Sequence, residues 1–281
     1  MARTPKARTL GAALRKERED RGFTMRDLSE RISRNQGDIS RWKTGDRTAK
    51  PEHVAQILTA LGISGEPYNE IMALAYDTDA PMWVATTLPA QRQQLAALVD
   101  AEQNASEITE VSPLMIPGLL QTRDYIRAVM SAGDGLSAAE IATRVAIRMG
   151  RQDVITRDQP TQFIAFIGEA AIWQIIGNRS VLLEQLRCLM NMAKRPNISL
   201  RVLTFGSGWH PGLEGPFILI QPTNSVPVVH LEMRNSGLFL HEEDDVEGYI
   251  DAIQAVSQQA LSAEESVRLI GKVVQRMEKV E

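Results

Sequence analysis

The chain of 281 residues has little of what most catalytic and metal sites are built from. It contains one cysteine, Cys188, and four histidines. One cysteine excludes an internal disulfide and suits a reducing compartment. The sequence has no HExxH segment, no CxxC pair and no GxSxG nucleophile elbow, which excludes the common zinc and serine-hydrolase signatures. We therefore predict no catalytic residues, no metal and no cofactor.

The residues that remain as candidates for catalysis or metal binding are scattered. His230 and Glu232 are two apart on an expected strand and so share one face. Scattered His and Glu residues of this kind are more often structural or exposed than catalytic. The glycines of residues 206–215 (GSGWHPGLEG) lie between two expected strands rather than before a helix, which argues against a phosphate cradle. The candidates are Glu169, His210, Glu214, His230 and Glu232.

Long apolar runs are also missing. No segment is apolar over the length needed to span a bilayer, and the N-terminal MARTPKARTLG has cations but no apolar stretch typical of a secretory signal. We predict a cytoplasmic protein that does not bind membranes. Residues 2–9 are predicted to be a mobile basic arm.

Charge is distributed unevenly along the chain. Residues 1–50 hold 14 Lys and Arg against 7 Asp and Glu, a net charge of +7, whereas residues 77–281 hold 17 against 25, a net charge of −8. A basic region of this kind is typical of nucleic-acid binding. The length supports two domains, and Pro81 and Pro89 interrupt the chain where the charge changes sign. We predict a DNA-binding domain at 1–76, a linker at 77–90 and a C-terminal regulatory and dimerisation domain at 91–281.

Residues 22–45 (GFTMRDLSERISRNQGDISRWKTG) have the spacing of a helix-turn-helix. Leu28 and Ile32 are four apart on one expected helix, and Ile39 and Trp42 are three apart on the next. The segment between them is so short that the two helices must cross steeply. The motif predicts that the second helix enters the major groove of DNA.

The polar residues of this motif predict its caps and its DNA contacts. Thr24 and Asp27 have the spacing of a capping box, and Asn35 is suited to cap the second helix. Asp38 then lies in the first turn of that helix, where the helix dipole favours an acid. Glutamine matches the edge of adenine and arginine matches that of guanine. We predict base reading by Gln36, Ser40 and Arg41. We predict phosphate contacts by Thr24, Asn35, Lys43, Arg47 and Lys50.

Three further helices are expected around the motif, at 10–21, 51–62 and 67–75. Five short helices and the segment DISRWKTG resemble the DNA-binding domain of the Xre and phage-repressor family, which implies an all-α domain. The family often has glutamate at the place of Lys43, commonly paired with an arginine of the first helix. Here that arginine would be Arg15 or Arg18, and the pair is lost.

Beyond the linker the pattern changes to alternating helices and strands. It predicts an α+β, possibly α/β, domain with a small sheet. Strands are expected at 106–111, 162–168, 198–204, 217–221 and 226–233. Helices are expected at 91–105, 118–130, 137–155, 170–176, 179–194, 246–260 and 262–279.

The C-terminal part carries a second resemblance. PGLLQT, RMGRQDVIT, GEAAIWQIIGNRSVLLEQLRCLM and FGSGWHPGLEGP, in this order, resemble the actinobacterial Xre-type regulators related to WhiJ, described as antitoxin-like transcriptional regulators. The resemblance implies a regulator encoded beside a small partner protein. Because one helix-turn-helix offers few base contacts, we predict a homodimer on a palindromic operator, acting as a repressor.

Two alternatives stay open for the C-terminal domain. It could sense a small molecule in a pocket lined by aromatic residues, with arginines nearby for an anion; the same residues could equally fill the core and form ion pairs. It could also act as an antitoxin that neutralises a small protein. The pocket candidates are Tyr125, Arg144, Arg148, Arg151, Trp173, Trp209, Pro211 and Phe217. The predicted surface for a partner or ligand consists of Arg148, Arg151, Trp209 and His210.

Overall fold

The computed structural model describes residues 4–76, 78, 80, 82–85, 87–133, 135–223, 225–233 and 236–279. The chain divides into two compact units, one of residues 1–101 with 222–246 and one of residues 102–221 with 247–281. Within the described ranges, every helix is too short or too polar to cross a membrane.

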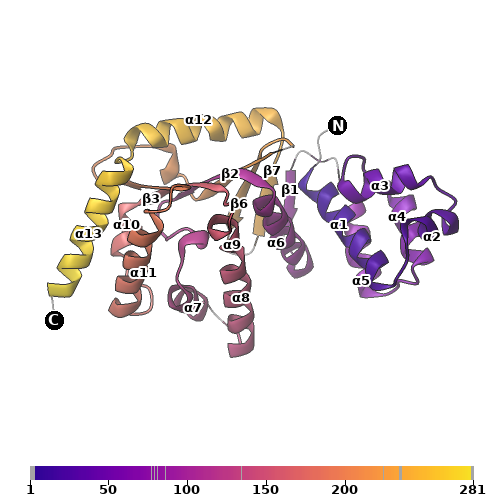
Figure 1. Cartoon of the computed structure of the whole chain (residues 1–281), viewed down its shortest axis with the longest axis horizontal. Helices are drawn as coiled ribbons and strands as arrows, with labels where there is room; N and C mark the ends of the chain where they lie inside the picture. Colours follow the sequence, from indigo (N-terminus) through magenta and orange to yellow (C-terminus); the bar gives the residue numbers. More distant parts are fainter. Residues whose placement is uncertain are drawn as a thin grey trace. The chain divides into compact units, whose positions relative to one another are not determined.

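Five helices form the N-terminal region, drawn in indigo and purple in Figure 1. Their apolar stripes meet in one core, in which Leu10, Leu28, Val54, Leu58 and Leu74 are at most 2% exposed. The sequence prediction of five short helices is confirmed. The helices are α1 (Pro5–Asp20), α2 (Met25–Arg31), α3 (Gln36–Thr44), α4 (Pro51–Ala60) and α5 (Glu66–Ala75).

The start of the chain differs from the mobile arm expected over residues 2–9. Helix α1 already begins at Pro5, because proline suits the first helical position and Thr4 caps the helix by accepting the N–H of Ala7 at 3.1 Å. The Thr4 hydroxyl also donates to the carbonyl oxygen of Thr78 at 2.8 Å. The prediction is therefore wrong for residues 5–9, and residues 2 and 3 lie outside the described residues.

The strands form one mixed sheet in the order β1-β7-β6-β5-β2-β3-β4. The helical N-terminal region followed by this sheet and its helices confirms the predicted fold class. The strands are β1 (Met82–Ala85), β2 (Ala105–Ser112), β3 (Gln162–Gly168), β4 (Ile198–Leu203), β5 (Phe217–Pro222), β6 (Val228–Met233) and β7 (Ser236–Leu240).

Strands β2, β3 and β4 are parallel neighbours, joined by helical connections. Phe163 of β3 is opposite Ile108 of β2 and Ile198 of β4, and all three side chains are buried. This near-continuous burial is typical of parallel strands that are covered on both faces. The strand predicted at 162–168 has the bounds of β3.

Strands β1 and β7 were not expected from the sequence, whereas β6 lies within the strand expected at 226–233. Strand β1 lies inside the expected linker 77–90 and pairs antiparallel with β7, with Trp83 opposite Phe239. Strand β6 pairs with the other side of β7, also antiparallel. The linker prediction is thus corrected at 82–85, where alternate side chains of β1 are buried, and at 88–90, where helix α6 (Leu88–Gln103) has already begun. Residues 77, 79, 81 and 86 of that linker lie outside the described residues, and the outer domain boundaries stay a prediction.

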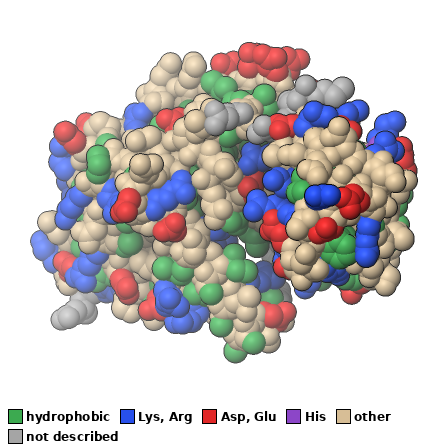
Figure 2. Space-filling model, turned by 45° about the vertical axis from the view of Figure 1, so that its right-hand side comes forward, with side chains coloured by type: hydrophobic (Ala, Val, Ile, Leu, Met, Phe, Trp, Pro, Cys, Tyr) green, Lys and Arg blue, Asp and Glu red, His purple; other side chains and the backbone are tan. Residues whose placement is uncertain are grey.

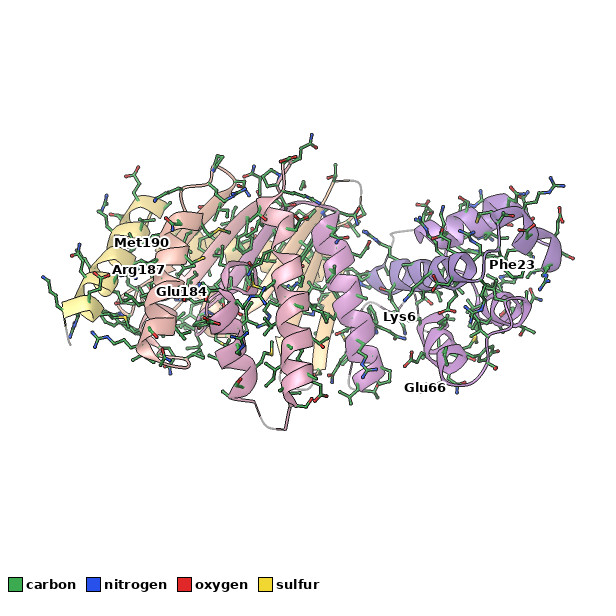
Figure 3. All side chains as sticks on the ribbon, turned by 60° about the horizontal axis from the view of Figure 1, so that its bottom comes forward. Lys6, Phe23, Glu66, Glu184, Arg187 and Met190 are labelled. Atoms are coloured by element: carbon green, nitrogen blue, oxygen red, sulfur yellow. The ribbon has the colours of Figure 1, made fainter. Side chains whose placement is uncertain are left out.

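Helices complete the C-terminal part. Figure 3 labels Glu184, Arg187 and Met190 on α11, which packs against α13. Arg187 forms an ion pair with Glu278 of α13. The helices are α6 (Leu88–Gln103), η1 (Gly118–Leu120), α7 (Arg123–Ser131), α8 (Ala138–Arg151), α9 (Asp153–Thr156), α10 (Glu169–Trp173), α11 (Arg179–Met192), η2 (Pro211–Leu213), α12 (Glu243–Gln259) and α13 (Ala263–Lys279).

Candidate nucleic-acid interface

The two helices of the motif are delimited by the predicted caps. Thr24 accepts the N–H of Asp27 at 3.1 Å, and the Asp27 carboxylate accepts the N–H of Thr24 at 2.8 Å, which completes a capping box on α2. Asn35 accepts the N–H of Gly37 at 2.7 Å and caps α3. Helix α3 ends at Gly45, whose φ of 72° suits glycine.

The inner face of α3 belongs to the core. Ile39 and Trp42 are each 5% exposed. Helix α1 approaches so closely that a Cβ on Gly11 would lie 2.5 Å from the carbonyl oxygen of Lys43. The Trp42 ring also stacks on His53 of α4, with centroids 5.0 Å apart. Helix α3 is therefore fixed from two sides, which is a requirement for reading bases with a defined geometry.

The predicted base readers lie on the other side of α3. Gln36 and Arg41 are exposed, and Ser40 is half-buried. Four of the five predicted phosphate contacts are exposed, namely Thr24, Asn35, Arg47 and Lys50. Figure 2 shows blue Lys and Arg side chains over this domain, with red Asp and Glu side chains between them. Exposure permits DNA contact but does not test it, so these roles stay predictions.

One acidic residue of α3 contacts two of these cations. The Oδ1 atom of Asp38 accepts from Nη2 of Arg41 at 2.6 Å and lies 3.2 Å from Nη1 of Arg47. The hydrogen bond from Arg41, followed by the positive charges of Arg41 and Arg47, lowers the pKa of Asp38. The sequence indicated only that the helix dipole favours an acidic residue at Asp38. The contacts of Asp38 with both arginines were not predicted.

Lys43 is placed differently from the other predicted phosphate contacts. It is half-buried and, with Arg15, Arg18, Leu14 and Trp42, lines a cavity of about 20 Å³ between the helices. Its predicted phosphate contact therefore receives no support from exposure.

From the sequence, Arg15 or Arg18 was expected to lack a glutamate partner, because Lys43 stands where the family often has glutamate. Both arginines contact a different acidic residue. Glu19 of α1 accepts from Arg15 at 2.9 Å and from Arg18 at 2.7 Å. The hydrogen bond from Arg15 is the main cause that lowers the pKa of Glu19. The four-residue spacing of Arg15 and Glu19 was the sequence signal for this pair.

The surface predicted in the C-terminal domain is not supported as one site. Arg151 makes two hydrogen bonds to Glu102, at 2.7 and 2.9 Å, and the two side chains are 9% and 2% exposed. Arg151 is thus a buried structural residue, which corrects its assignment to a surface. His210 is also buried, at 4%, whereas Trp209 is 70% exposed.

Arg148 belongs to a polar network around η1. Its Nη1 atom donates to Oε1 of Gln121 at 3.1 Å. Gln152 donates to the carbonyl oxygen of Gln121 at 2.6 Å, and Gln185 donates to that of Leu120 at 2.8 Å. These bonds tie the PGLLQT and RQ segments together, so this sequence combination has a structural reason.

The other candidates for catalysis do not gather. His230 is buried against Phe239, with ring centroids 4.6 Å apart, and Glu169 bonds Trp173 and the backbone of Phe205. Among the described residues, no group of three or more His, Cys, Asp or Glu is placed to hold a metal ion.

Two known families match separate parts of the chain. Residues 9–70 match the helix-turn-helix domain, which together with the exposed α3 indicates a DNA-binding regulator. Residues 95–272 match the family described as a domain of unknown function (DUF5753), and the chain belongs to this family. The searches of curated proteins and of solved structures gave no match.

Proposed function

We propose that the protein is a sequence-specific transcriptional regulator of the Xre type that acts as a repressor. Helix α3 lies in the major groove, with Gln36, Ser40 and Arg41 at base edges. Two copies bind the two half-sites of a palindromic operator. The observation that carries the proposal is the exposed, capped α3, supported from behind by Ile39 and Trp42.

Electrostatics supports the same proposal. Residues 1–50 carry a net charge of +7, which attracts the phosphate backbone. The side chains of Arg41 and Arg47 are 55% and 64% exposed, so both can reach DNA without a change of fold. Binding to any DNA is then strongly weakened by salt, and only the operator keeps high affinity at physiological salt.

We propose in addition that the C-terminal domain holds the dimer together and receives a signal from a small partner protein encoded nearby. The support is the resemblance of this part of the sequence to regulators of actinobacteria related to WhiJ. We also propose that the chain is not an enzyme, because its sequence carries no motif with a catalytic mechanism attached.

The proposal is tested by fluorescence anisotropy with labelled DNA from the protein's own promoter region. The titration is repeated at several salt concentrations and with scrambled DNA as competitor. Tight binding that depends on salt and survives the competitor supports the proposal. Weak binding that is equal for both DNAs contradicts it.

Arg41→Ala tests the base contact in the same assay. We expect a loss of about 1–3 kcal/mol in operator binding and relaxed specificity at one base pair. The matched control is Arg26→Ala, which removes an arginine that is 77% exposed and paired with Glu30 on α2. If the Arg41 variant keeps the ratio of operator to scrambled affinity, Arg41 does not read a base.

A further inference from the structure

Five large hydrophobic side chains are exposed at one edge of the sheet. The last residues of the parallel strands β2, β3 and β4 lie side by side: Ser112 is opposite Ile167, and Gly168 is opposite Leu203. The segments that follow these strands therefore leave the sheet at the same edge. We name the exposed side chains the apolar rim. It consists of Leu114 (68% exposed), Ile175 (53%), Phe205 (73%), Trp209 (70%) and Leu213 (58%).

The segments that carry the apolar rim are held together by direct contacts. Glu169 accepts the N–H of Phe205 at 3.0 Å and Nε1 of Trp173 at 3.3 Å, which joins the segments after β3 and β4. The segment after β2 is equally close, since a Cβ on Gly168 would lie 2.0 Å from the carbonyl oxygen of Pro113. These contacts join the three segments that carry the apolar rim.

The segments that carry the apolar rim have no charged residues of their own, and the nearest acidic residues, Glu169 and Glu214, flank them. Residues 113–117, 170–178 and 204–213 contain no Asp, Glu, Lys or Arg. A two-fold contact places a surface against its own copy, so a charged surface would meet like charges. A neutral apolar surface meets no such opposition. Contiguous exposed apolar patches on soluble proteins mark interaction sites.

The size of the apolar rim suits a dimer contact. At these exposed fractions, side chains of this size present roughly 100 Å² each, or roughly 500 Å² together. A specific interface takes about 800 Å² from each partner, with an apolar centre and a polar border. The apolar rim supplies the centre, and the backbone and polar side chains of the same segments supply the border.

We propose that the apolar rim is the surface through which two copies of this chain form a homodimer. This inference rests on the proposed function, in which two copies bind two half-sites, and it assigns the contact that joins them. The partner is a second copy because the segments of the apolar rim are uncharged and apolar, and the rim has the area expected for the centre of a dimer contact.

The test measures the mass of the full chain by light scattering after gel filtration, without DNA. The expected wild-type mass is twice the chain mass of 31.2 kDa. Trp209→Lys/Leu213→Lys places like charges in the contact and is expected to give the single-chain mass. The control is Met82→Lys/Val84→Lys, which adds the same charge at two exposed apolar residues of β1 and leaves the dimer intact.

A mixing experiment separates repulsion from misfolding. Trp209→Glu/Leu213→Glu is also expected to be monomeric, but an equal mixture of the Lys and Glu variants places opposite charges across the contact and restores the double mass. Far-UV circular dichroism is expected to stay unchanged in all variants, because both substituted side chains are mostly exposed.

Trp209 also reports on the contact directly. It is the most exposed tryptophan, since Trp42 and Trp83 are 5% and 6% exposed and Trp173 is half-buried. Acrylamide quenching is expected to rise several-fold for this residue when the protein is diluted, and the Trp209→Phe variant is expected to lose this dependence.

A wild-type monomer at every concentration, or a dimer that survives both rim variants, would overturn the inference. A wild-type monomer whose Trp209 emission instead changes with the anionic aromatic dye 1-anilinonaphthalene-8-sulfonate would make the rim a small-molecule site. Because no DNA is present, these results do not depend on operator binding. A dimer that does not discriminate DNA would contradict only the proposed function.

Discussion

Asp38 and Arg41 form an ion pair on α3, with Oδ1 and Nη2 2.6 Å apart, and the same carboxylate oxygen lies 3.2 Å from Arg47. One acidic residue thus orients a predicted base reader and a predicted phosphate contact before DNA arrives. The lowered pKa keeps this carboxylate charged at neutral pH. DNA must then compete with Asp38 for both arginines, through a base edge for Arg41 and through a phosphate for Arg47.

Asp38→Asn is therefore expected to strengthen binding to DNA of any sequence. The slope of the logarithm of the binding constant against the logarithm of the salt concentration becomes steeper by about one. The ratio of operator to scrambled affinity falls, because Arg41 loses its fixed orientation. Anisotropy titrations at several salt concentrations measure both quantities. Asp20→Asn, at an exposed position of α1, is the control for charge alone. An unchanged ratio in the Asp38 variant would show that the pair does not orient Arg41 for base reading.

Trp42→Ala is expected to reduce stability rather than specificity. Trp42 is 5% exposed and stacks on His53, so its truncation leaves a cavity under α3 and lowers the free energy of unfolding by about 3–5 kcal/mol. Urea unfolding measures the loss. Operator and scrambled affinities, measured where the variant is folded, keep their ratio. A change of that ratio without a loss of stability would place Trp42 at the DNA.

The helix-turn-helix was predictable because its signals are local. Thr24 and Asp27 are three residues apart, and Ile39 and Trp42 share a helical face, so spacing alone gives the cap and the core. Strand β1 was missed because its partner β7 begins more than 150 residues later in the chain. Without knowledge of that partner, the four residues after Pro81 were predicted to be part of a linker.

For the site residues, too, contacts between residues far apart in the sequence could not be predicted. Arg148 and Arg151 have the spacing of an exposed helical face, and nothing local tells that Glu102 removes Arg151 from the surface. Likewise, the sequence indicated only a helix-dipole role for Asp38. Its contact with Arg47 was missed because Arg47 lies beyond the end of α3. Side chains that pair across separate elements need the fold before their role can be assigned.

Acid is expected to destabilise the helix-turn-helix domain through His53. Burial first, and then the charge of Arg34, lower the pKa of His53 below the usual 6.5. The unfolded chain therefore takes up a proton first, and the free energy of unfolding falls as the pH decreases from 6.5 to the lower pKa of the folded state. Above pH 6.5 this residue has no effect.

Thermal unfolding of His53→Gln at several pH values on either side of 6.5 tests this expectation. The variant should show a weaker loss of stability in acid than the wild type. Burial also lowers the pKa of His210 and His241, so part of the acid sensitivity is expected to remain. An identical pH dependence of the wild type and the variant would exclude a contribution of His53.

Breaking the ion pair of Glu102 and Arg151 is expected to lower stability strongly. Glu102→Gln removes the carboxylate that makes two hydrogen bonds to Arg151, whose side chain is 9% exposed, and we expect a loss of about 3–5 kcal/mol in urea unfolding. The double variant Glu102→Leu/Arg151→Met removes both charges and should recover most of this loss. As a matched control, Asp124→Asn breaks an exposed pair with Arg127 and should cost about 0–1 kcal/mol. Equal losses for the buried and exposed pairs would contradict the assignment of Arg151 to the core and return it to the surface predicted from the sequence.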